Sequence, residues 1–208
     1  MRRRILVLPV AFALAIVPAG LVAQACIGVP VAESQNAFTA SVGFPENATS
    51  YGAAFRRNVE GPFSVGASYS LYSYKDVDPK QHAFGVEADY ELPGLSFSAC
   101  PTVGLGYSRM SADGGTLTAF SVPVGVGFGT RIELSPSAAL IPHVVPQWVW
   151  TRASIEVAGE SVSDNDSALA ALFGATLALP RFYVGGQVTW VDRDNVDPTL
   201  TILAGLPF

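Results

Sequence analysis

Apolar and polar residues alternate one by one along most of this 208-residue chain, from about residue 38 to its end. In the closing stretch 199–208, for example, Leu200 and Ile202 alternate with Thr199 and Thr201. A period of two puts successive side chains on opposite faces of a β-strand. The chain is therefore predicted to be all-β, with one strongly apolar face on each strand.

Stretches with this pattern recur with turn-like residues between them. A strand that crosses a membrane at a tilt needs about 9–11 residues, and the spacing leaves room for that length. The pattern predicts ten strands, with eight as the alternative. The stretches are 38–44, 51–56, 63–72, 84–92, 97–108, 120–133, 140–151, 169–177, 182–190 and 199–208.

The connections are of two kinds that alternate along the chain. Pro- or Gly-bearing segments are typical of tight turns, and they lie at 58–61, 92–94, 134–137 and 179–180. Longer polar links are predicted at 45–49, 75–81, 110–115, 157–166 and 192–198. An even number of strands with short turns on one side and longer loops on the other indicates an antiparallel up-and-down transmembrane β-barrel.

Composition separates this barrel from a soluble alternative. Only 14% of the residues are charged, and there are 20 glycines. A soluble β-sandwich or lipocalin-like barrel would turn the apolar face inward and show Gly, Ser and Thr to water. A barrel in lipid needs the apolar face outside and small or polar residues inside.

The N-terminus has the form of a secretory signal peptide. Arg2, Arg3 and Arg4 precede an apolar run, and 23–25 is an Ala-Gln-Ala cleavage-like tripeptide. A transmembrane anchor is the competing interpretation. We predict a signal peptide at 1–25, a short periplasmic segment at 26–35 and the barrel at 36–208.

The chain has two cysteines, Cys26 and Cys100. Exported proteins meet an oxidising compartment, so the two can form a disulfide that ties the mature N-terminus to the barrel. Cleavage after Ala25 would also place Cys26 first, as in a lipoprotein. However, Ala23 stands where a lipoprotein signal normally has a Leu-like residue.

The alternation, the signal peptide and the closing strand with its terminal Phe208 together resemble small outer-membrane β-barrel proteins of Gram-negative bacteria. The resemblance implies an outer-membrane location and Phe208 as part of the signal for the insertion machinery. It also implies contact with outer-membrane lipid and lipopolysaccharide, and a monomeric barrel.

Charged and polar residues in the inward register are candidates for a lumen network. Either they are ion pairs that hold a narrow lumen together, or they form a selectivity lining for a cation or small solute. They are Arg56, Glu87, Asp89, Glu91, Arg131, Glu133, His143, Gln147 and Gln187.

Acidic residues are concentrated in the five longer links, which hold ten acids and three bases. Without the first 25 residues the chain has 9 Lys and Arg against 17 Asp and Glu, a net charge of −8. That balance excludes a nucleic-acid binder, which needs clustered cations. The spacing matches no calcium loop and no zinc site, so no metal or cofactor is predicted. The acidic residues predicted to lie in the outer loops, as a candidate interaction surface, are Asp76, Asp78, Asp164, Asp166, Asp192, Asp194 and Asp197.

These observations predict a structural or surface-interaction barrel rather than an enzyme. The alternative is a narrow cation-favouring channel. A third possibility is an outer-membrane enzyme of the omptin or lipid-modifying type, for which His82 near Asp76 and Asp78 is the best candidate. No nucleophile-elbow motif supports it.

Overall fold

The computed structural model describes residues 26, 28–29, 36–60, 62–75, 79–93, 95, 97–112, 114–194 and 196–208. The predicted signal peptide lies outside these residues. In the described part no helix is both long and apolar enough to cross a membrane. The strands are β1 (Asn36–Phe44), β2 (Ala48–Glu60), β3 (Phe63–Tyr74), β4 (Gln81–Tyr90), β5 (Ser98–Ala112), β6 (Gly115–Gly129), β7 (Ile132–Ser135), β8 (Ala138–Val157), β9 (Glu160–Ala178), β10 (Tyr183–Val191) and β11 (Thr199–Pro207).

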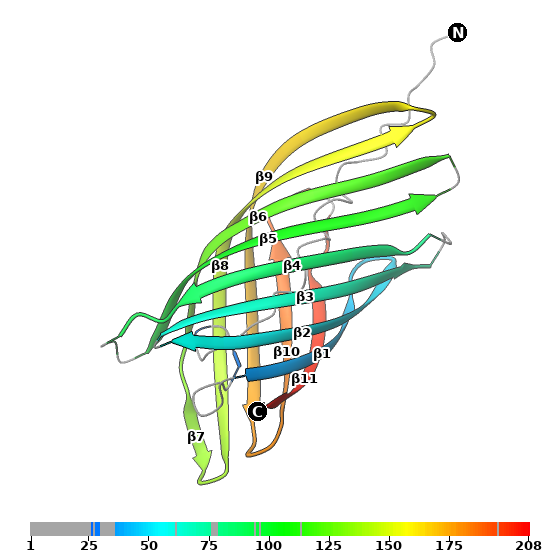
Figure 1. The fold of residues 1–208 in the computed structure, drawn as a ribbon. Coiled ribbons are helices and arrows are strands. Elements are labelled where there is room, and N and C mark those ends of the chain that lie inside the picture. The colour runs from blue at the N-terminus through cyan, green and yellow to red at the C-terminus, as the bar shows by residue number, and fades with distance from the viewer. Residues whose placement is uncertain are drawn as a thin grey trace.

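All neighbouring strands run antiparallel and form a closed barrel (Figure 1). The first strand pairs with the last, and β6 pairs with β8. The short β7 follows β6 after a two-residue interruption and pairs only with the start of β8. The wall therefore has ten strands, which confirms the predicted fold and strand number.

The seam of the barrel lies between β1 and β11, drawn side by side in blue and red in Figure 1. Their register runs from Ala37 opposite Pro207 to Phe44 opposite Leu200. Asn36 and Phe208 exchange two backbone hydrogen bonds, each 2.9 Å long. We call this end, where β1 begins and β11 stops, the terminal end. The opposite end, where the β5–β6 and β8–β9 turns lie, is the hairpin end.

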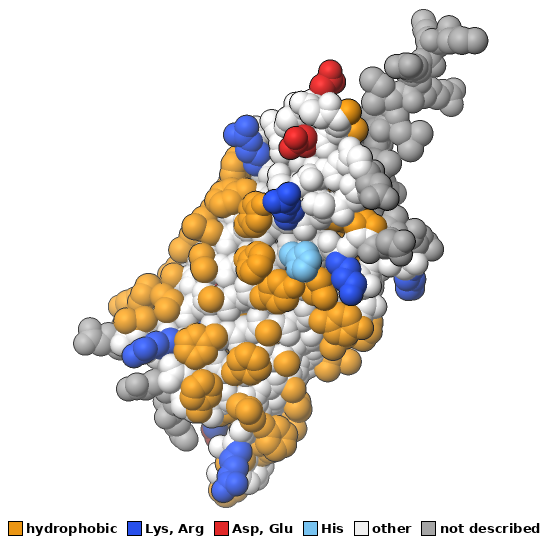
Figure 2. Space-filling model, turned by 45° about the vertical axis from the view of Figure 1, so that its right-hand side comes forward, with side chains coloured by type: hydrophobic (Ala, Val, Ile, Leu, Met, Phe, Trp, Pro, Cys, Tyr) orange, Lys and Arg blue, Asp and Glu red, His pale blue; other side chains and the backbone are white. Residues whose placement is uncertain are grey.

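The two faces of the wall are inverted relative to a soluble protein. Large apolar side chains are exposed on the outside, including Phe84 (53%), Phe173 (53%) and Ile202 (55%). Polar side chains such as Gln187 (2%) and Thr201 (1%) are buried inside. Soluble monomers rarely expose apolar patches larger than a few hundred square ångströms, whereas Figure 2 shows such side chains over much of the barrel wall. This distribution rules out the soluble sandwich or lipocalin alternative.

The long links predicted at 110–115 and 157–166 are corrected by the structure. β5 continues to Ala112 and β6 begins at Gly115, while β8 and β9 are joined by the two residues Ala158 and Gly159. Both of these have positive φ (52° and 84°), as a two-residue type I′ hairpin turn requires. Four long strands thus project together past the barrel at the hairpin end (Figure 1).

Candidate functional site

An ion-pair cluster crosses three strands of the lumen near the terminal end. Arg56 on β2 donates from Nη1 to Asp89 Oδ1 (2.5 Å) and to Ser64 Oγ (3.0 Å), and from Nη2 to Glu87 Oε1 (2.7 Å). Ser64 Oγ also donates to Asp89 Oδ2 at 2.7 Å. Gly66 lies between Arg56 and Glu87 on β3, and a Cβ there would be 3.1 Å from Glu87 Oε1. The glycine therefore leaves room for the guanidinium to reach β4.

The two carboxylates of this cluster face a single guanidinium. The side chains of Arg56 and Asp89 are 5% and 1% exposed, so neither charge is solvated by bulk water. Buried charges of this kind need partners, and each of these has one. The sequence predicted Arg56, Glu87 and Asp89 in the lumen, and in the structure Arg56 contacts both carboxylates. Together with Ser64 they link the side chains of β2, β3 and β4 through hydrogen bonds and ion pairs.

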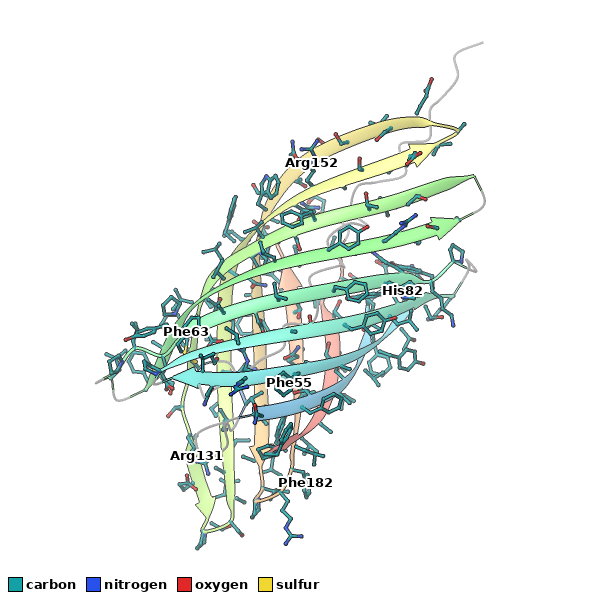
Figure 3. The ribbon with its side chains drawn as sticks, viewed as in Figure 1. Phe55, Phe63, His82, Arg131, Arg152 and Phe182 are labelled. Carbon is teal, nitrogen blue, oxygen red and sulfur yellow. A yellow bond between two sulfur atoms is a disulfide. The ribbon has the colours of Figure 1, made fainter. Side chains whose placement is uncertain are left out.

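Glu91, Arg131 and Glu133 do not join this cluster. Glu91 lies one residue past the end of β4 and accepts a hydrogen bond from Ser98 Oγ at 2.6 Å. Arg131 and Glu133 form their own ion pair of 2.5 Å, with side chains 38% and 61% exposed. Figure 3 shows Arg131 beside β7, away from the lumen. The sequence predicted both in the lumen, but here the chain has already left the barrel wall, so both faces of β7 are exposed to solvent.

Residues of an N-terminal segment also lie in the lumen near this end. Cys26 and Cys100 form a disulfide, and Cys26 is completely buried. Val29 is 1% exposed, and a Cβ at Gly28 would be 2.3 Å from Cε1 of His143. The described residues of the segment 26–35 thus lie inside the barrel. They pack in an apolar cluster of Cys26, Val29, Ala37, Cys100, Val145, Leu172, Tyr183 and Leu203.

Tyr183 completes the closure of the terminal end. Its side chain is fully buried, and its hydroxyl lies 2.6 Å from Thr39 Oγ1 and donates to the Phe38 carbonyl oxygen at 3.3 Å. The hydroxyl end of the ring lies against Gly205, where a Cβ would be 2.2 Å from Tyr183 Cζ. Only glycine fits at that position. Tyr183 was not predicted, although its inward register beside a glycine was visible in the sequence.

His143 and Gln187 belong to the packed interior. His143 Nδ1 donates to the Ile141 carbonyl oxygen at 3.3 Å, and its ring covers Gly174. His143 Nε2 and Gln187 Oε1 have no hydrogen-bond partner among the described residues, and both atoms are enclosed by protein. Gln147 faces the lumen opposite Gly125 and is half-buried. These side chains fill space, and among the described residues no acid–base pair forms around the imidazole.

The hairpin end of the lumen is closed by a second group. Tyr74 Oη donates to Gln81 Oε1, and Gln81 Nε2 donates to Ser108 Oγ at 3.2 Å. Tyr72 is 3% exposed, and its cluster joins β3, β4, β6 and β8. The members of that cluster are Tyr72, Ala83, Ala119 and Ala153, with Tyr74 against them. Sequence reasoning missed both tyrosines, although they occupy inward positions that Ser and Gly hold elsewhere on β3.

Two of the predicted loop acids, Asp164 and Asp166, lie in strand β9 instead. Their carboxylates accept hydrogen bonds from the backbone N–H groups of Asn165 (2.9 Å) and Ser167 (2.6 Å). Asp166 also forms an ion pair with Arg193 from the β10–β11 link. Burial lowers the pKa of Arg193, and the Asp166 carboxylate opposes that shift. The acids therefore bind groups of their own chain.

The remaining acids that the structure describes do not form a metal site. Asp192, Asp194 and Asp197 lie in the β10–β11 link, as predicted, while Asp76 and Asp78 fall outside the described residues. Within the described part no three His, Cys, Asp or Glu side chains converge as metal ligands. His82, the candidate for an enzyme, lies on the outer face of β4 and forms a 2.8 Å hydrogen bond with Tyr69 Oη.

Comparison with known proteins supports the fold. No family model matches the sequence, and no curated protein does. Among solved structures, the translocator domain of the autotransporter NalP from Neisseria meningitidis matches with a TM-score of 0.50 and 11% identity, over 83% of this chain and 87% of that one.

Two further matches are more distant. The β domain of the Bordetella autotransporter BrkA has a TM-score of 0.45 and 14% identity, over 83% of this chain and 98% of that one. The KdgM porin in complex with disordered oligogalacturonate has a TM-score of 0.41 and 9% identity, over 83% and 99%. Likeness at such identities concerns the fold alone. With its ten-stranded wall, apolar outside and polar inside, this chain is a small β-barrel of the outer-membrane type.

Proposed function

We propose that this chain is an integral barrel of the Gram-negative outer membrane with a structural or surface-interaction role. The observation that carries the proposal is the closure of the lumen at both ends. At the terminal end the closing side chains include Cys26, Val29 and Tyr183, all 0–1% exposed. At the hairpin end Tyr72 and Gln81 are 3% and 1% exposed.

The projecting strands support the second half of the proposal. β5, β6, β8 and β9 form a continuous sheet beyond the wall, because β6 pairs with β8 as far as Gly115 opposite Val157. The barrel anchors this sheet outside the apolar band. This sheet exposes polar side chains together with Ile155, Val157 and Val162, and a mixed surface held clear of the membrane is suited to contact with other envelope components.

A narrow cation-favouring channel is the second candidate. One observation favours it: the Glu87 side chain keeps 28% of its surface exposed within the lumen. Carboxylates along a pore favour cations. Such a pore would have to pass both closures.

Conductance in planar bilayers distinguishes the two candidates. Purified protein should first show heat-modifiable migration on SDS gels, which reports a folded barrel. The proposed role predicts no stepwise conductance in KCl from that same preparation. Stepwise, cation-selective openings of the wild-type protein would overturn it in favour of the channel.

A further inference from the structure

The strands that project past the barrel reverse the arrangement of side chains in the wall. We call the part of β5, β6, β8 and β9 beyond Arg109 and Arg152 the projecting sheet (Figure 1). In the wall the large apolar side chains face outward. In the projecting sheet the outward positions of β5, β6 and β8 are polar, and they are Ser111, Thr116, Thr118, Ser154 and Glu156. The outer face of this sheet is therefore suited to water and not to lipid.

Apolar side chains lie on the opposite face, which we call the axis-facing face because it continues the lumen side of the strands. Ile155 is in the same register as Ala153, which is 7% exposed and belongs to the cluster at the hairpin end. A row of four apolar residues crosses this face, one from each strand, and each pairs with the next. In the order β5, β6, β8 and β9 they are Met110, Leu117, Ile155 and Val162. Three strand spacings make the row about 14 Å long.

The described part of the chain leaves this row uncovered. Ile155 is 40% exposed, and Val157, two residues nearer the turn on the same face, is 54% exposed. Val162 is 73% exposed, more than any other large apolar side chain among the described residues. The apolar face of a sheet normally packs against a second layer. Lipid cannot supply that layer, because the axis-facing face lies over the mouth of the barrel.

The charges on the axis-facing face have one sign. Among the described residues of the projecting sheet, its charged side chains all belong to β9 and are all acidic. Glu160 and Asp164 lie on either side of Val162. Asp166 comes next, and its carboxylate already pairs with Arg193. A complementary surface would carry apolar side chains for the row and cations for Glu160 and Asp164.

The edge of the projecting sheet is less open than its face. β9 is the outermost strand (Figure 1), because its pairing with β10 stops at Ala170 opposite Val191. An open edge can accept a further strand, and charged side chains on the edge oppose this. The carboxylates of Asp164 and Asp166 already bind backbone N–H groups of β9. The chain therefore protects the edge and leaves the face available.

We propose that the axis-facing face of the projecting sheet binds a cationic amphipathic helix of a partner. A helix of about ten residues is about 15 Å long and matches the row. Its apolar stripe would cover Leu117, Ile155 and Val162, and Lys or Arg beside the stripe would face Glu160 and Asp164. A second copy of this chain fits less well, since it would bring the same acids to the contact. The inference rests on the proposed surface-interaction role and adds the site and the chemistry of the partner.

The test uses the full-length barrel in nanodiscs of phosphatidylcholine, with empty nanodiscs as the blank. The probe is a fluorescent peptide of about 14 residues, made of Leu and Lys, with leucines at the spacing of one helix face. Fluorescence anisotropy measures its Kd. Three comparison peptides have the same residues in scrambled order, strict Leu-Lys alternation for strand addition, or Glu in place of Lys. The wild-type barrel should bind the helical peptide at least about tenfold more tightly than any of them.

Removal of the apolar row should give the largest loss. Ile155→Ser/Val162→Ser should bind the helical peptide at least about tenfold more weakly, because one buried aliphatic side chain contributes about that factor. The matched control is Ile132→Ser/Leu134→Ser, which removes two exposed apolar side chains from β7 (46% and 58%). The control should bind as the wild type does. Equal binding by the two double variants would overturn the inference.

Removal of the acids should give a smaller loss. Glu160→Gln/Asp164→Asn should bind about threefold more weakly at low salt, and the difference from the wild type should shrink as KCl is added. The control Glu133→Gln/Glu156→Gln removes the same charge from other surfaces and should bind as the wild type does. An effect of the control as large as that of Glu160→Gln/Asp164→Asn would contradict the proposed charge complementarity.

Three further outcomes would also overturn the inference. The first is wild-type binding of the scrambled peptide as tight as that of the helical one. The second is equally tight binding of the alternating peptide, which would indicate strand addition at the β9 edge. The third is a wild-type dimer, seen by native mass spectrometry, that Ile155→Ser/Val162→Ser abolishes, because a second copy would then cover the face.

Heat-modifiable migration before reconstitution keeps these outcomes separate from the proposed function. Failure to bind the helical peptide by a protein that migrates as a folded barrel and does not conduct rejects the helix site alone. Migration that boiling does not change would reject the barrel itself.

Discussion

The two ends of the lumen are closed in different ways. At the terminal end the closing contacts join residues far apart in the sequence: Arg56 and Asp89 are 33 residues apart, Cys26 and Cys100 are 74, and Thr39 and Tyr183 are 144. At the hairpin end the hydrogen bonds join neighbouring strands, with Tyr74 and Gln81 only 7 residues apart. The first closure needs the finished barrel, whereas much of the second forms within one hairpin.

The chemistry of the two closures differs as well. The terminal end combines a buried ion pair, a disulfide and an apolar cluster. Removal of one partner of the buried ion pair leaves an unpaired charge in the interior, which strongly lowers the free energy of unfolding. The hairpin end uses neutral hydrogen bonds around a tyrosine, each of which contributes little to the net free energy of unfolding. We therefore expect substitutions at the terminal end to be the more damaging.

The largest effect is expected for Arg56→Ala. It leaves the buried Asp89 carboxylate and the partly buried Glu87 carboxylate without their cation, which should lower the free energy of unfolding by about 3–5 kcal/mol. Urea unfolding in lipid vesicles, followed by tryptophan fluorescence, measures it. Arg131→Ala is the control, because its exposed pair with Glu133 should contribute about 0–1 kcal/mol. Equal effects of the two substitutions would contradict the difference between buried and exposed pairs.

The disulfide comes second. The double variant Cys26→Ser/Cys100→Ser should lose about 2–4 kcal/mol of stability. Reduction of the wild-type protein should lower its urea midpoint of unfolding to that of the variant. The midpoint of the variant itself should be the same with and without reductant. If reduction leaves the wild-type midpoint unchanged, the Cys26–Cys100 disulfide does not stabilise the terminal end of the barrel.

Gly205→Ala tests the packing at the seam. The new Cβ would be 2.2 Å from Tyr183 Cζ and 2.4 Å from the Phe38 carbonyl oxygen, so the ring must move. Overpacking of this kind should lower stability by about 1–3 kcal/mol. Gly186→Ala on β10 is the control, because the atom nearest to its new Cβ would be the Thr201 carbonyl oxygen at 3.8 Å. A stable Gly205→Ala barrel would show that Tyr183 is not held in place.

The smallest effect is expected at the hairpin end. Tyr74→Phe removes the hydroxyl that donates to Gln81, and the loss should be about 0.5–1.5 kcal/mol. The same urea measurement applies, with Tyr51→Phe on the exposed face as the control. A loss as large as that of Arg56→Ala would remove the distinction between the two ends.

The fold followed from the alternation because lipid and lumen impose opposite demands on successive residues of every spanning strand. The same reasoning failed where a strand leaves the membrane. Around Asp164 and Asp166 both faces of β9 are exposed, so the alternation in hydropathy disappears and the segment resembles a loop.

The lumen site was predictable in part. Register alone placed Arg56, Glu87 and Asp89 inside, but register does not say where the wall stops, so Arg131 and Glu133 were included wrongly. Nor does it say how far a side chain extends across the lumen. That distance decides which residues close a barrel, and Tyr72 and Tyr183 were therefore missed.

The seam between β1 and β11 has a consequence for the order of biogenesis. Cys26 and Cys100 both belong to the first half of the chain, so their bond can form in an exported chain before β11 has arrived. The ring, in contrast, cannot close until the last residues, up to Phe208, lie against Asn36. If the disulfide forms first, the pairing of β11 with β1 closes the barrel around an N-terminal residue, Cys26, that is already bonded to β5.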